Sequence, residues 1–181
     1  METTFLLDKD YRMVVRDEVK QILMQADNSV LKMAEETAIE EIKSYLSGRY
    51  DVAKIFVQLY RFIPNQQWGA EDYVYNTDDT VYKALVDSPG DDFTDAGDWQ
   101  ASDPRNKLVV SFAVKVAVYH LHSHISPRNI PELRVKQYDD TIAFLKLAAN
   151  GKTNIDLPLL EDVGAQGTFR LGSNLKTSQR W

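Results

Sequence analysis

The sequence predicts a mainly α-helical fold: a four-helix bundle-like body that carries a small antiparallel β insertion and ends in an extended C-terminal arm. Residues 108–121 are the most apolar stretch of the chain, and the segments around it repeat apolar residues at helical spacing. Residues 72–85 instead alternate aromatic and β-branched residues, as strands do. The predicted units are the helical body (1–55 and 103–152), the insertion lobe (56–102) and the arm (153–181).

The stretch from Leu108 to Leu121 predicts the central helix. Only three of its residues are polar, and a helix that is apolar nearly all round must be buried on most sides. Asp103-Pro104 has the residue types that begin helices, and Ser126-Pro127 has those that end them. The run is shorter than the roughly 20 apolar residues that cross a bilayer, and Lys115 interrupts it. We therefore expect a core helix and no membrane span.

Three amphipathic helices are expected around this centre, at residues 8–23, 29–49 and 131–150. Each has one apolar stripe to bury, and the short connection at 126–131 makes the last helix an antiparallel neighbour of the central one. The second helix also carries an acidic edge, which we interpret as a solvated face. This edge consists of Glu35, Glu36, Glu40 and Glu41.

Residues 56–102 predict a small β lobe. A hairpin is expected at 72–85, with turn residues at 76–79, and Trp99 begins a possible third strand after a loop rich in Asp and Gly. The lobe has few aliphatic residues, so its aromatic side chains are interpreted as a miniature core, with a sugar-stacking surface as the alternative. These side chains are Tyr73, Tyr75, Tyr82, Phe93 and Trp99.

The apolar residues of 153–181 show no helical or strand periodicity, and the segment contains proline and several glycines. Such a segment cannot form a core alone, so it predicts an arm that is disordered or orders on a partner. Its candidate anchors combine apolar and basic side chains: Phe169, Arg170, Leu171, Leu175, Lys176, Arg180 and Trp181.

Composition excludes several classes of protein. A formal net charge of -6 argues against a protein that binds nucleic acid by neutralising phosphates. The absence of cysteine rules out disulfides and fits a reducing compartment. The N-terminus lacks a basic region followed by an apolar run, so we expect no signal peptide and folding in a cytoplasm.

No pattern in the sequence predicts catalysis. His120 and His124 share a helix face and could bind one metal ion, but His122 points nearly opposite and no HExxH motif is present. The chain also lacks a nucleophile elbow and a glycine-rich phosphate loop. Adjacent aspartates diverge on any element, and the spacing in the lobe matches no calcium loop. We expect no enzyme activity, catalytic residue, metal or cofactor; a histidine metal enzyme is the least favoured alternative.

Four segments, taken together, suggest a family. Residues 38–52 end in an Arg-Tyr pair, 114–122 are rich in small apolar residues, 126–140 contain a Tyr-Asp pair, and 143–152 end in Gly-Lys. In this order they resemble helices of the head-tail connector (adaptor) proteins of tailed phages and Mu-like prophages. The lobe is longer than that pattern. Its Tyr75 to Ala84 core, followed by Trp99, looks like the β modules of phage appendages and chitin-binding proteins.

The resemblance implies a structural virion protein of the phage neck, assembled in the host cytoplasm. Such subunits form a homo-oligomeric ring, typically of twelve copies, that docks on the portal and extends a channel through which DNA passes without sequence-specific binding. The ring also provides a platform for the next neck or tail protein. By this reading the arm docks on the portal, and the lobe contacts a ring neighbour or a neck component through Tyr73, Tyr75, Tyr82 and Trp99. The alternative is a carbohydrate-binding module carried on a helical body.

Overall fold

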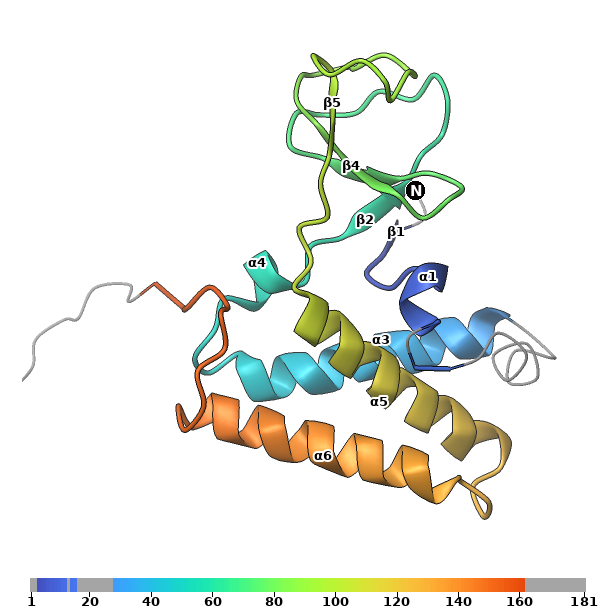
Figure 1. The fold of residues 1–181 in the computed structure, drawn as a ribbon, viewed down its shortest axis with the longest axis vertical. Helices are drawn as coiled ribbons and strands as arrows, with labels where there is room; N and C mark the ends of the chain where they lie inside the picture. Colours follow the sequence, from blue (N-terminus) through green and yellow to red (C-terminus); the bar gives the residue numbers. More distant parts are fainter. Residues whose placement is uncertain (1–2, 13, 16–27, 162–181) are drawn as a thin grey trace, which may run out of the picture.

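The structure is a computed structural model that describes residues 3–12, 14–15 and 28–161. It has a helical body on which a β lobe stands (Figure 1). In chain order the elements are β1 (Thr3–Thr4), α1 (Asp8–Tyr11), α3 (Asn28–Leu46), α4 (Val52–Ile55), β2 (Leu59–Arg61), β3 (Tyr73–Tyr75), β4 (Val81–Ala84), β5 (Trp99–Ala101), α5 (Lys107–Ile125) and α6 (Glu132–Ala149).

Helix α5 is the centre of the body, as predicted. It packs against both α3 and α6, which also contact each other. By length and composition alone α5 could cross a membrane, but here it forms the middle of the main hydrophobic core. The helix starts later than predicted, because Asn106 is its N-cap and accepts hydrogen bonds from the backbone N–H groups of Leu108 and Val109. Its buried residues are Val109, Phe112, Ala113, Val114, Val116, Ala117, Val118 and Leu121.

The five strands form one mixed sheet in the order β1-β2-β3-β4-β5. Strands β2 and β3 are parallel, and the other neighbours are antiparallel. The hairpin predicted at 72–85 is confirmed, since β3 and β4 pair directly across the turn that contains Asn76. The Asn76 side-chain oxygen accepts hydrogen bonds from the backbone N–H groups of Asp78 and Thr80.

The predicted fold class, mainly α with a four-helix bundle-like body and a purely antiparallel insertion, is wrong. Helix accounts for 43% of the structure, beside a five-stranded mixed sheet. Of the five helices in the described residues, only α3, α5 and α6 exceed a single turn. The helix predicted at 8–23 is represented by the one turn of α1, and most of its remaining residues lie outside the described ranges. Strand β1 adds to the edge of the lobe, so the sheet draws on the N-terminus as well as on the insertion.

Each face of the sheet covers its own small core. On one face Trp68, Val74, Ala84 and Trp99 are buried. Partly buried aromatic rings complete this core, and the ring centroids of Phe93 and Tyr82 are 4.3 Å apart. On the other face Leu7, from the segment that precedes α1, packs with Leu59 and Val81. The N-terminal segment is therefore shared between the lobe and the helical body.

Candidate assembly surfaces

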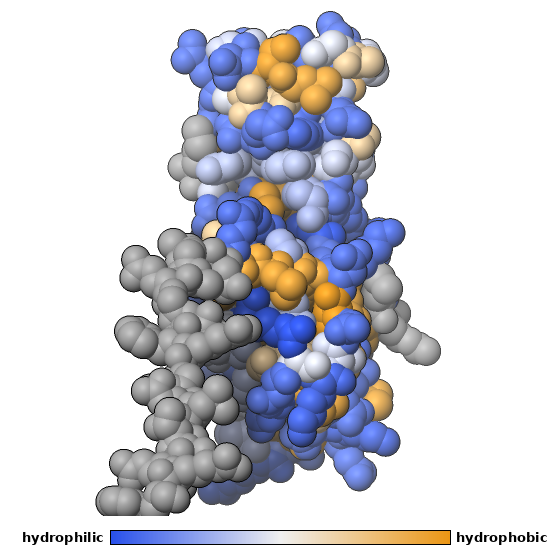
Figure 2. Space-filling model, turned by 90° about the vertical axis from the view of Figure 1, so that its left-hand side faces the viewer, coloured by the Kyte–Doolittle hydropathy of each residue, from blue (hydrophilic) through white to orange (hydrophobic). Residues whose placement is uncertain are grey.

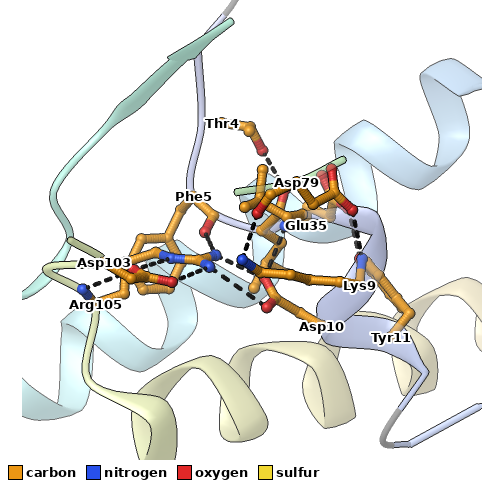
Figure 3. Close-up of polar contacts among 11 residues, drawn as sticks. Thr4, Phe5, Lys9, Asp10, Tyr11, Glu35, Asp79, Asp103 and Arg105 are labelled. Atoms are coloured by element: carbon orange, nitrogen blue, oxygen red, sulfur yellow. Dashed lines mark hydrogen bonds and ion pairs between the residues drawn. The ribbon is translucent and has the colours of Figure 1, made fainter. Parts of the chain in front are cut away.

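A buried guanidinium lies at the junction between lobe and body (Figure 3). The Arg105 side chain, only 1% exposed, sits between the last strand and α5 and reaches the N-terminal segment. Its Nη1 donates to the Phe5 carbonyl at 2.7 Å and to the Asp10 carboxylate at 2.6 Å. Its Nε and Nη2 donate to the Asp103 carboxylate at 2.9 and 2.7 Å, and Nη2 also reaches Asp10 at 3.4 Å. All five N–H donors of the side chain thus have acceptors.

The ion pairs at this junction shift the pKa values of Asp103 and Arg105 toward their charged forms. Burial alone would raise the pKa of the Asp103 carboxyl. The hydrogen bonds and the charge of Arg105 lower this pKa by more than burial raises it, so it lies below its ordinary value. Burial likewise lowers the pKa of Arg105, and its two carboxylate partners more than reverse this. This cluster of Arg105 and two carboxylates joins two segments far apart in the sequence, the N-terminal segment and residues 103–105. It therefore fixes the direction in which the lobe leaves the body.

The N-terminal segment makes three further hydrogen bonds near the junction. The backbone N–H of Lys9 donates to the Asp79 carboxylate at 2.8 Å, and the Lys9 ammonium donates to the Asp79 carbonyl. The Tyr11 hydroxyl donates to Glu35 on α3 at 2.5 Å. Burial raises the pKa of Tyr11 well above its ordinary value, and Glu35 adds to the effect. The segment thus holds the β3–β4 turn against α3, and a groove of ≈ 490 Å³ lies between these elements.

The C-terminal segment packs on its own body further than predicted. Gly151, at φ +67°, turns the chain after α6, a conformation that favours glycine. Leu159 then forms an antiparallel bridge with Tyr50, and the Leu160 N–H donates to the Arg49 carbonyl at 3.0 Å. Leu157 is buried in the main core. Residues 153–161 are therefore part of the body, contrary to an arm that starts at 153. The candidate arm anchors, Phe169 to Trp181, lie outside the described residues.

Of the four candidate contact residues of the lobe, Trp99 is buried, whereas Tyr73, Tyr75 and Tyr82 are partly buried. Trp99 is 3% exposed, and its Nε1 donates to the Gly90 carbonyl at 2.7 Å. Tyr82 packs beside it in the same core, while Tyr73 and Tyr75 pack against the core of the opposite face. A sugar-stacking surface needs an exposed ring. Because Trp99 is buried, it cannot be the stacking ring of the carbohydrate-binding alternative.

Two of the three histidines of α5, His120 and His124, line one shallow pocket. His120 lies 2.8 Å from the Glu41 carboxylate, whose other oxygen accepts a hydrogen bond from the Tyr138 hydroxyl at 2.6 Å. Across the described ranges, no group of three or more His, Asp or Glu side chains is placed to hold a metal ion. Burial, followed by the Glu41 contact, raises the pKa of Tyr138. Glu41 thus joins three helices, although the sequence pattern assigned it to a solvated edge.

We expect the Tyr138→Phe substitution to lower the free energy of unfolding by about 1–3 kcal/mol, because it removes a hydrogen bond to a carboxylate. The ring remains stacked on Tyr119, at a centroid distance of 4.1 Å, so little packing is lost. Urea denaturation at pH 7 measures the change. Asp139→Asn, an exposed position on the same helix, is the matched control and should leave the midpoint unchanged; an equal effect of both variants would contradict the assignment.

Comparison with known proteins gives a match in the second half of the chain. A family model described as Bacteriophage Mu, Gp36 matches residues 103–172. The match begins at Asp103 in the junction and runs through α5, α6 and the segment that packs on Tyr50. No curated protein and no solved structure matches the chain significantly. The lobe lies outside the matched residues.

Proposed function

We propose that this Mu-like phage protein is a structural subunit of the virion neck, a head-tail connector that forms a closed ring on the portal. The family match carries the proposal, because it covers two of the three long helices of the body and the segment leading into the arm. As a phage protein it is expected in or near the virion; we propose the neck as its position and the host cytoplasm as its place of assembly.

The course of the C-terminal segment supports an arm that docks on the portal. Residues 153–161 are anchored on the body, and an ion pair of 2.8 Å between Lys54 and Glu161 lies at the end of the anchored part. The remaining residues combine basic and apolar side chains. An extended segment of this kind binds through its backbone and through pockets for alternate side chains. We propose that Phe169, Arg170, Leu171, Leu175, Lys176, Arg180 and Trp181 provide these contacts.

The acidic balance of the chain suits a channel through which DNA moves. Each subunit has a net charge of -6, and we propose that the ring contains twelve copies. The combined negative charge repels the phosphate backbone of DNA and does not hold it. The same ring offers a platform for the next neck or tail protein. Nothing in this role requires catalysis.

Electron microscopy of the purified protein, mixed with the portal protein of the same phage, tests the proposal. We expect closed rings coaxial with the portal, and a mass that rises by a whole number of subunits in mass photometry. The protein without portal is the control for self-assembly. Separate monomers beside bare portals, at protein concentrations well above those of the portal, would contradict the proposal.

A further inference from the structure

Two apolar side chains are exposed side by side in the sequence, just before the arm. Leu159 and Leu160, the strap patch, are 55% and 49% exposed. They belong to the strap, residues 157–161, which follows α6 and runs along the body. Figure 2 shows hydrophobic side chains at mid-height on the side of the molecule where the strap lies.

Backbone hydrogen bonds and one buried side chain hold the strap in place. The Pro158 carbonyl accepts from the Asp51 N–H at 2.9 Å, and the Leu160 N–H donates to the Arg49 carbonyl at 3.0 Å. Leu157 is the apolar anchor, since it is buried in the main core. The strap patch is therefore an apolar surface at a fixed position on the body.

The charged side chains of the strap and of residues 49–54, on which it packs, balance one another. Lys54 lies 3.3 Å from Asp51 and 2.8 Å from Glu161. Arg49 supplies the second cation, so the two basic and two acidic side chains have no net formal charge. The strap patch thus has neutral surroundings, which suit an apolar partner surface and give no attraction for a strongly charged one.

The strap patch is too small to hold a partner alone. A stable protein–protein interface buries roughly 1,000 Å² or more, and two leucines that are about half exposed offer only a small part of this. A partner that is already held nearby needs much less, because tethering makes the second contact intramolecular, with an effective concentration near millimolar. The occupant of the patch is therefore a partner that the chain itself brings there.

The arm is the tether next to the patch. Phe169, the first of its proposed anchors, follows Leu160 by nine positions, which span at most about 30 Å when fully extended. We infer that the portal protein, held by the arm, also covers the strap patch, so that its docking site extends from the arm onto the body. This inference rests on the proposed function. The two leucines add to the anchors of the arm and do not replace them.

Leu159→Ser with Leu160→Ser in the full chain tests the contact. Biolayer interferometry on immobilised portal protein of the same phage measures the dissociation constant. We expect it to rise at least about tenfold, because two half-exposed leucines amount to roughly one buried leucine side chain. The matched control is Met33→Ser with Leu133→Ser, at positions that are 64% and 60% exposed. These lie near the starts of α3 and α6, whereas the strap packs near the ends of both helices, so the control should bind like the unaltered protein.

A cross-linking measurement does not depend on the folding of the serine variant. Because the chain contains no cysteine, Leu160→Cys gives a single attachment point for benzophenone maleimide, and irradiation of the complex should join it to the portal protein. Cross-links to the arm or to a second copy in place of the portal, or an unchanged dissociation constant of the serine variant, would overturn this contact and leave the connector proposal intact. Failure of the unaltered protein to bind the portal would instead refute the connector proposal, and this contact with it.

Discussion

Replacing Arg105 with methionine is expected to lower the free energy of unfolding by about 3–5 kcal/mol, the usual cost of removing one partner from a buried ion pair. The substitution removes the Arg105 donors from the Phe5 carbonyl and from the largely buried Asp10 carboxylate, which keeps its hydrogen bond from the Leu7 N–H. Urea denaturation followed by circular dichroism measures the change. Arg128→Met, at an exposed position, is the control and should change the stability by less than about 0.5 kcal/mol.

The effect of this substitution should depend on pH with a definite sign. Burial raises the pKa of Asp103, but Arg105 lowers it below the ordinary value in the folded protein. A lowered carboxyl pKa stabilises the fold above the unfolded pKa of about 3.9, and this stabilisation is lost as the pH falls through the folded pKa. The difference in the free energy of unfolding between the unaltered protein and Arg105→Met should therefore be constant near pH 7. It should become smaller below about pH 4. If this difference in the free energy of unfolding stayed constant down to pH 3, the ion pair between Asp103 and Arg105 would contribute nothing to stability.

The central helix could be predicted because its signal is local. Residues 108–121 are so apolar that only burial is consistent with them, and the structure places them between α3 and α6. The start of the helix was misplaced for an equally local reason. Asp103-Pro104 and Asn106 are both plausible beginnings, and the choice depends on Arg105, which engages the Asp103 carboxylate and leaves Asn106 as the cap.

The mixed sheet could not be predicted because its evidence is spread along the chain. Strand β1 has two residues and β2 has three, too few to show an alternation. The parallel pairing of Tyr60 with Val74 depends on the path of the connecting loop, which has no periodic signal. The same holds for the junction. Asp10 and Arg105 are separated by 95 positions, and a single arginine after a proline carries no recognisable pattern.

Two truncations should separate the folded part of the C-terminal segment from the part that binds. We expect a chain without Gly164 to Trp181 to unfold at the same urea concentration as the full chain and to lose portal binding in a pull-down. It keeps the contacts of Leu157 and Leu159 with the body but loses every proposed anchor. Retained portal binding would refute the docking role of the arm.

A chain that ends at Lys152 should differ from this one in stability. It loses the buried Leu157, the partly buried Ile155 and the backbone bonds that Pro158 and Leu160 make with residues 49–51. Burial of one leucine side chain contributes about 2–3 kcal/mol, so we expect a loss of about 3 kcal/mol. The Leu157→Ala substitution in the full chain is the matched comparison, since it should reproduce most of this loss while portal binding persists. If both truncations were equally stable, residues 153–161 would belong to the arm, and the body would end with α6.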